Sequence, residues 1–148
     1  MTSELSAMLS SVNDDELVSA YGNFVKELME REIVTSKNIT GDMGEHMVIE
    51  RYCSIRGLPR FLKAPDGAKN VDALSAQGER YSIKTVTSKT TGSFYGLEPK
   101  GSKKDDIQVF EYLVVAVMDD HYRLVKLLEF DWTKFLKHKS RNSRIKTS

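Results

Sequence analysis

An apolar run at residues 110–119 most constrains how this chain can fold. It reads FEYLVVAVMD, a composition typical of a strand that is buried on both faces. The end of this run and the two residues after it, DDH at 119–121, favour a turn. The next stretch, YRLVKLLEF, alternates enough to be an antiparallel partner. The sequence therefore predicts a sheet that is organised around residues 110–130.

Helices are expected before and after this sheet. Asn13 is a good N-cap and is followed by three acidic residues, which favours a helix from Asp14 onwards. A second helix is expected from Thr40 or Asp42 to Arg56, with Gly57 just beyond its end. Its apolar stripe is predicted to consist of Val48, Tyr52 and Ile55.

The remaining elements are short. Strands are expected in the stretches RFLKA, VDALS and RYSIKTVT, and a closing helix in DWTKFLKHK with Asp131 as its cap. The order predicts a mixed α/β or α+β domain, with N-terminal helices first and a central mixed sheet flanked by helices. Residues 1–148 are interpreted as one domain, with 1–35 as a helical extension and 36–148 as the core.

Composition narrows the class of protein. The chain has 148 residues, of which 40% are hydrophobic, enough for one core. No apolar run approaches 18 residues, and the N-terminus lacks the pattern of a secretory signal. With a single cysteine, Cys53, no internal disulfide can form. We therefore expect a cytoplasmic protein without a membrane partner.

The near-neutral net charge of +1 hides an uneven distribution. Residues 1–32 hold two basic and seven acidic side chains, a net charge of −5, whereas residues 134–146 hold six basic and no acidic side chains, a net charge of +6. A basic end of this kind can bind a polyanion. The alternative is a solvated tail that binds nothing.

Two acidic residues occupy positions that need an explanation. Glu45 falls on the apolar stripe of the second helix, where burial of a carboxylate without a partner is costly, which points to a site. The alternative is that Glu45 is only a favourable negative charge near the helix N-terminus. Asp72 lies in the apolar stretch NVDAL, and because aspartate is disfavoured in strands, its presence there points to a site. The alternative is that Asp72 ends the turn that precedes the strand.

The turn between the strands at 71–75 and 80–87 decides whether Asp72 can meet Lys84. A type I turn from Ser75 to Gly78, with Gly78 in the left-handed conformation, pairs Ser75 with Glu79 and sets Asp72 opposite Ser82. Ser82 and Lys84 then share a face with Asp72. A two-residue turn would instead set Asp72 opposite Ile83 and separate the group. We predict the first register, with these residues and Glu45 around one accessible spot.

Carboxylates beside a lysine can do specific chemistry. Asp72 and Glu45 offer the hard oxygen ligands that Mg²⁺ or Mn²⁺ prefers. A metal there would bind a phosphate oxygen and activate water, and Lys84 would hold the water and stabilise charge that develops on the phosphate.

This arrangement resembles the PD-(D/E)xK nuclease superfamily, which has the restriction-endonuclease-like fold. The resemblance rests on Gly44-Glu45 in a helix, Asp72 on one strand and Ser-Ile-Lys at 82–84 on the next, and it covers most of the chain after Thr35. The stretches GDMGEHMVIERY, NVDALSAQGERYSIKTVTSKTTGSFYGL, FEYLVVAVMDD and HKSRNSRI look like a group of small uncharacterised members.

The resemblance implies a metal-dependent DNA endonuclease, a hydrolase of restriction or defence type. The family's aspartate, lysine and helix glutamate fall on Asp72, Lys84 and Glu45, and its second acidic position falls on Ser82, a poorer metal ligand. Asp72 and Glu45 are the expected metal ligands for Mg²⁺ or Mn²⁺. DNA is the expected partner, and a homodimer is one option. Phosphate contacts are expected from Ser88, Lys89, Thr90, Thr91, Lys137, Arg141 and Arg144.

Two other functions remain open. A DNA-binding module that kept the fold and lost cleavage is favoured by Ser82, and it predicts salt-sensitive affinity for DNA without hydrolysis. A protein-interaction subunit, in which Asp72 and Lys84 form a structural ion pair, predicts neither binding to DNA nor cleavage.

Overall fold

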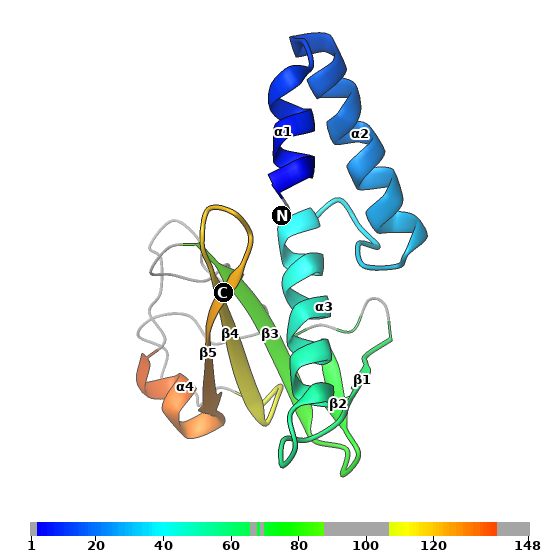
Figure 1. Ribbon diagram of the computed structural model, residues 1–148. Helices are drawn as coiled ribbons and strands as arrows, with labels where there is room; N and C mark the ends of the chain where they lie inside the picture. The colour runs from blue at the N-terminus through cyan, green and yellow to red at the C-terminus, as the bar shows by residue number, and fades with distance from the viewer. Residues whose placement is uncertain (1–2, 66–67, 69, 88–106, 139–148) are drawn as a thin grey trace. The chain divides into compact units, whose positions relative to one another are not determined.

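A computed structural model describes residues 3–65, 68, 70–87 and 107–138 of the chain. In these residues the chain forms four helices and one five-stranded sheet, with the helices of the N-terminal part first (Figure 1). This confirms the predicted α+β class. The chain separates into two compact units, Met1–Asp42 and Met43–Ser148.

The first unit contains α1 (Ser3–Ser11) and α2 (Asp14–Glu30). Asn13 caps α2 as predicted: its Oδ1 accepts the N–H of Glu16 at 2.9 Å, and its own N–H donates to Glu16 Oε1 at 3.4 Å. Helix α1 was not predicted. Leu5, Leu9 and Val12, spaced at helical intervals, were the available signal.

Helix α3 (Ile39–Ser54) begins one residue before the earlier of its two predicted starts and ends two residues early. Its buried residues are Gly44, Val48 and Tyr52. The predicted stripe was wrong at Ile55, which lies beyond the last helical residue and is 42% exposed. Gly57, three residues beyond the end of the helix, has a φ of +93°, a conformation that favours glycine, in the turn where the Leu58 N–H donates to Ile55 O at 3.3 Å.

The sheet has the order β1-β2-β3-β4-β5. Strands β1 (Phe61–Lys63), β2 (Ala73–Ser75) and β3 (Arg80–Val86) pair antiparallel, β3 pairs parallel with β4 (Tyr112–Met118), and β4 pairs antiparallel with β5 (Leu124–Asp131). The mixed sheet and the antiparallel β4–β5 pair are as predicted. Helix α4 (Trp132–His138) follows, and Asp131 Oδ1 caps it by accepting the N–H of Lys134 at 2.8 Å.

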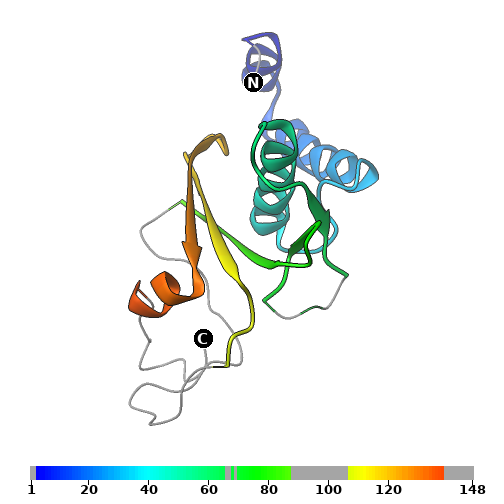
Figure 2. The same ribbon diagram turned by 90° about the horizontal axis from the view of Figure 1, so that it is seen from below.

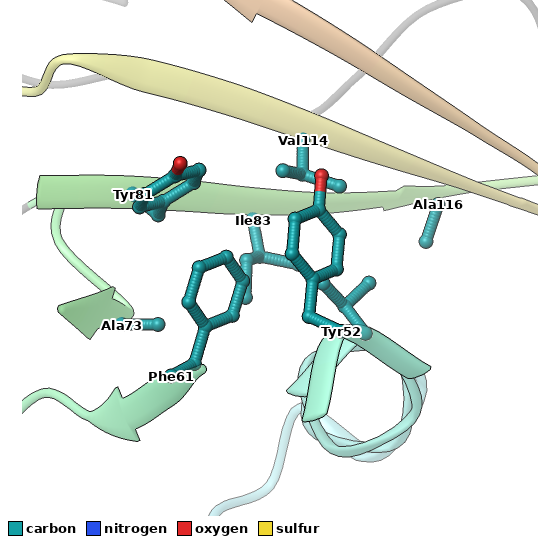
Figure 3. Packing of buried hydrophobic residues seen from close by; sticks show 8 residues of the cluster. Tyr52, Phe61, Ala73, Tyr81, Ile83, Val114 and Ala116 are labelled. Atoms are coloured by element: carbon teal, nitrogen blue, oxygen red, sulfur yellow. The ribbon is translucent and has the colours of Figure 1, made fainter. Parts of the chain in front are cut away.

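Alternate residues of the central strands feed two cores. On one face Tyr81 and Ile83 pack with Val114 and Ala116 against Val48 and Tyr52 of α3 (Figure 3). On the other, Val86, Leu113 and Val115 pack against Phe135 of α4. Helices α3 and α4 therefore cover opposite faces of the sheet (Figure 2).

The first core is rich in aromatic rings. Tyr52 stacks on Phe61 with ring centroids 4.4 Å apart, and Tyr81 lies 4.4 Å from Phe61 and 4.9 Å from Tyr112. Such ring pairs add to the stability that their buried area provides. Within the described parts of the chain, no helix is both long and apolar enough to cross a bilayer.

Candidate functional site

The β2–β3 hairpin has the predicted register. Ala73 pairs with Tyr81 and Leu74 with Arg80. The N–H of Gly78 donates to Ser75 O at 3.0 Å, the N–H of Ser75 donates to Glu79 O at 3.0 Å, and Gly78 has a φ of +82°. The type I turn with a left-handed glycine is thus confirmed, and it fixes which residues of β3 lie beside the start of β2.

Asp72 lies directly before β2 and ends the pairing between the two strands. Its N–H donates to Tyr81 O at 2.8 Å, and its Oδ2 accepts the N–H of Ile83 at 2.7 Å. A side-chain oxygen thus accepts a backbone N–H of β3 just beyond the last residue pair of the two strands, and this bond orients the carboxylate.

Lys84 lies on β3, two residues beyond Ser82, and is half-buried. Burial lowers the pKa of its ammonium group, and the charges of Asp72 and then Glu45 act in the opposite direction without reversing the shift. The two carboxylates therefore lie close enough to Lys84 for their fields to act on it. Asp72 and Glu45 are thus the two carboxylates whose charges act on Lys84.

Gly44 lies where α3 approaches β3. A Cβ atom built at Gly44 would collide with Thr85 Oγ1 and lie 2.8 Å from Thr85 Cβ. Only a glycine allows α3 to approach β3 this closely. Glu45 is the next residue on the helix, and its charge acts on Lys84. Thr85 was not singled out by the sequence, which offers no signal for a contact between residues so far apart.

Ser82 was expected to lie at a solvent-accessible spot shared with Asp72 and Lys84, and the structure differs from this expectation. Its side chain is fully buried, and its Oγ has no hydrogen-bond partner among the described residues; the same holds for Thr85 Oγ1. A buried hydroxyl without a partner is uncommon, because the lost hydration is not replaced. The two oxygens point to opposite faces of β3, and Thr85 lies on the face that packs against α3.

An ion pair joins the first residue of β3 to the residue directly before β4, and it was not predicted from the sequence. Arg80 Nη2 lies 2.7 Å from Glu111 Oε2, and Arg80 Nε lies 3.0 Å from Glu111 Oε1. Hydrogen bonds from Arg80 lower the pKa of Glu111. This fork holds the start of β3 against the start of its parallel neighbour and so supports the strand that carries Lys84.

Most of the predicted phosphate contacts cannot be placed. Ser88, Lys89, Thr90, Thr91, Arg141 and Arg144 lie outside the described residues. Lys137 is exposed on α4, one turn after the exposed Lys134, so both cations lie on one side of this helix.

A second group of potential ligands occupies the β4–β5 turn. Asp119, Asp120 and His121 bring one ligand atom each within 4.8 Å of the others. Asp119, however, already accepts the N–H groups of His121 and Arg123 and pairs with the Arg123 side chain at 2.9 Å. These hydrogen bonds stabilise the β4–β5 turn, and the turn explains why the three side chains lie close together.

Comparison of the chain with protein-family models and with curated proteins finds no match.

Proposed function

We propose that this protein is a metal-dependent DNA endonuclease of the PD-(D/E)xK type with a restriction-endonuclease-like core. The observation that carries the proposal is the placement of Lys84, a half-buried lysine within the fields of Asp72 and Glu45. A lysine held in a partly buried site by two carboxylates from different elements is typical of a reactive centre. The order of α3, the β2–β3 hairpin and β4 supports the same assignment.

The donor set fits a hard divalent cation. Asp72 and Glu45 would hold Mg²⁺ or Mn²⁺ through carboxylate oxygens. The buried Ser82 Oγ, which has no partner among the described residues, would be a neutral oxygen near Asp72, whose Oδ2 accepts the N–H of the next residue, Ile83. A bound cation would supply positive charge that activates water and neutralises a phosphodiester. The bond from the Ile83 N–H keeps the Asp72 carboxylate in one orientation.

Lys84 supplies the remaining chemistry. Its ammonium group would donate hydrogen bonds to the attacking water and to a phosphate oxygen on which negative charge grows. Because the side chain is half-buried, these interactions are stronger than they would be in bulk water. Lys134 and Lys137 of α4, both exposed, are candidates for positioning contacts to the DNA backbone.

The test is cleavage of supercoiled plasmid with Mg²⁺ or Mn²⁺. Asp72→Asn should lower the rate at least about 100-fold, because the amide loses the charge a cation needs. The fold should persist, since the amide oxygen can still accept the Ile83 N–H. Lys84→Met should cause a loss of similar size. The matched controls are Asp120→Asn and Lys126→Met, which remove the same charges from exposed positions. Equal cleavage by wild type and Asp72→Asn would refute the assignment.

One observation favours a second function. Ser82 occupies the position where the family has an acidic ligand, and it is fully buried. If that loss removes catalysis, the protein is a DNA-binding module of the same fold. The plasmid would then stay intact with every metal, while DNA affinity would fall steeply with added salt.

A further inference from the structure

Helix α2 carries an apolar stripe that its own unit leaves exposed. Leu17, Tyr21 and Phe24 are 46%, 64% and 42% exposed, and they continue to the half-buried Leu28 at the spacing of one helix face. Helix α2, all of which the structure describes, contains no buried side chain. A helix of this length gains little stability in water without burying an apolar face, so the stripe needs a partner.

The two charged residues on this face lie at its ends and have opposite signs. Asp14 lies three residues before Leu17, and Arg31 lies three residues after Leu28, so both fall on the same stripe at its two ends. The other charged residues of α2 lie off the stripe: Asp15, Glu16, Lys26, Glu27 and Glu30. The stripe itself is therefore neutral, with an acid at one end and a base at the other.

We propose that this stripe, defined as Asp14, Leu17, Tyr21, Phe24, Leu28 and Arg31, binds the same stripe of a second copy of the chain with the two helices antiparallel. In that orientation Leu17 meets Leu28 of the second copy and Tyr21 meets its Phe24. Asp14 meets Arg31 at both ends. Each contact occurs twice, as a two-fold interface requires.

Other pairings fit less well. A parallel pair would set Asp14 against Asp14 and Arg31 against Arg31, which is repulsive at both ends. A basic amphipathic partner would be attracted by the acidic residues beside the stripe, but it would not match the acid and the base at the two ends of the stripe, which a second antiparallel copy does. Arg31 already holds Glu27 through Nε at 2.8 Å, and its guanidinium has further N–H groups with which to reach an acid across the interface.

The first experiment is sedimentation of the full chain over a concentration series. We expect a monomer–dimer equilibrium in the wild type. Tyr21→Glu places a charge at the centre of the interface twice per dimer and should raise the dimer Kd at least about 100-fold. Ser19→Glu, an exposed position of the same helix off the stripe, should change it by less than about twofold. A wild type that stays monomeric at every concentration would overturn the proposal.

The second experiment tests the register and leaves the apolar residues intact. Asp14→Arg alone and Arg31→Asp alone should each raise the Kd by roughly 3–10-fold, because like charges then meet at both ends. The double variant should restore the wild-type Kd to within about twofold. Asp15→Arg controls for the loss of an acidic residue in the first turn of α2. Failure of the double variant to restore the dimer would exclude the antiparallel register.

Discussion

The two faces of strand β3 differ in the kind of residue that they carry. The odd-numbered face, Tyr81, Ile83 and Thr85, packs under α3, and the first two of these residues belong to an aromatic and aliphatic core. The even-numbered face is polar at Arg80, Ser82 and Lys84, with an ion pair, a buried hydroxyl without a partner among the described residues and a half-buried lysine. Only its last residue, Val86, belongs to the apolar core under α4.

This comparison teaches that stability and candidate chemistry come from alternate residues of one strand. Burial of Tyr81 and Ile83 is favourable because it removes apolar surface from water. Burial of Ser82 and Lys84 is costly because it removes polar groups from water. Rigid packing on one face can therefore hold unfavourable groups in place on the other.

The largest expected effect lies on the odd-numbered face. Tyr81→Ala removes a ring that contacts both Phe61 and Tyr112, so the free energy of unfolding should fall by about 3–5 kcal/mol. Chemical denaturation followed by circular dichroism measures this change. Thr87→Ala, at an exposed position just beyond the same strand, is the control and should change stability by less than about 0.5 kcal/mol. A small loss at Tyr81 would remove the distinction between the faces.

A smaller effect is expected where α3 touches this face. Gly44→Ala forces a methyl group against Thr85, and overpacking of this kind should cost about 1–3 kcal/mol. Gly22→Ala is the matched comparison, because a Cβ there meets no described atom within 4 Å. Alanine at that helical position should stabilise α2 by up to about 1 kcal/mol. Thermal unfolding of both variants should show shifts of opposite sign, and a gain at Gly44 would contradict the close approach.

The smallest effect is a pH dependence on the even-numbered face. The pKa of Lys84 is lower in the folded chain, so between the folded and unfolded values the unfolded chain binds more protons and wild-type stability rises with pH. Lys84→Met has no ammonium group whose burial costs free energy, so this variant should be more stable than wild type at pH 7. The difference should shrink as the pH approaches 10. Denaturation at several pH values measures it, and a constant difference would show that Lys84 is not penalised.

The sequence by itself determined the local structure. The caps at Asn13 and Asp131 and the turn at Ser75–Gly78 are formed by groups within four residues of one another, so residue type and spacing suffice to predict them. The register of the hairpin followed from that turn, and the apolar run at 110–119 identified β4. The joint placement of Asp72 and Lys84 was predictable for the same reason, since a short hairpin connects them.

Only the tertiary structure decided the contacts between distant segments. Gly44 packs on Thr85, and the charge of the neighbouring Glu45 acts on Lys84. Arg80 and Glu111 are 31 residues apart in the chain, and they pair because β3 and β4 are neighbours in the sheet. Alternation along β3 predicted that Ser82 lies on an accessible face with Asp72 and Lys84, but Ser82 is buried. Ile55 was predicted to lie on the apolar stripe of α3, but it is exposed because α3 ends before it. Periodicity along a strand or helix predicts which residues share a face, but burial depends on what the fold places against that face.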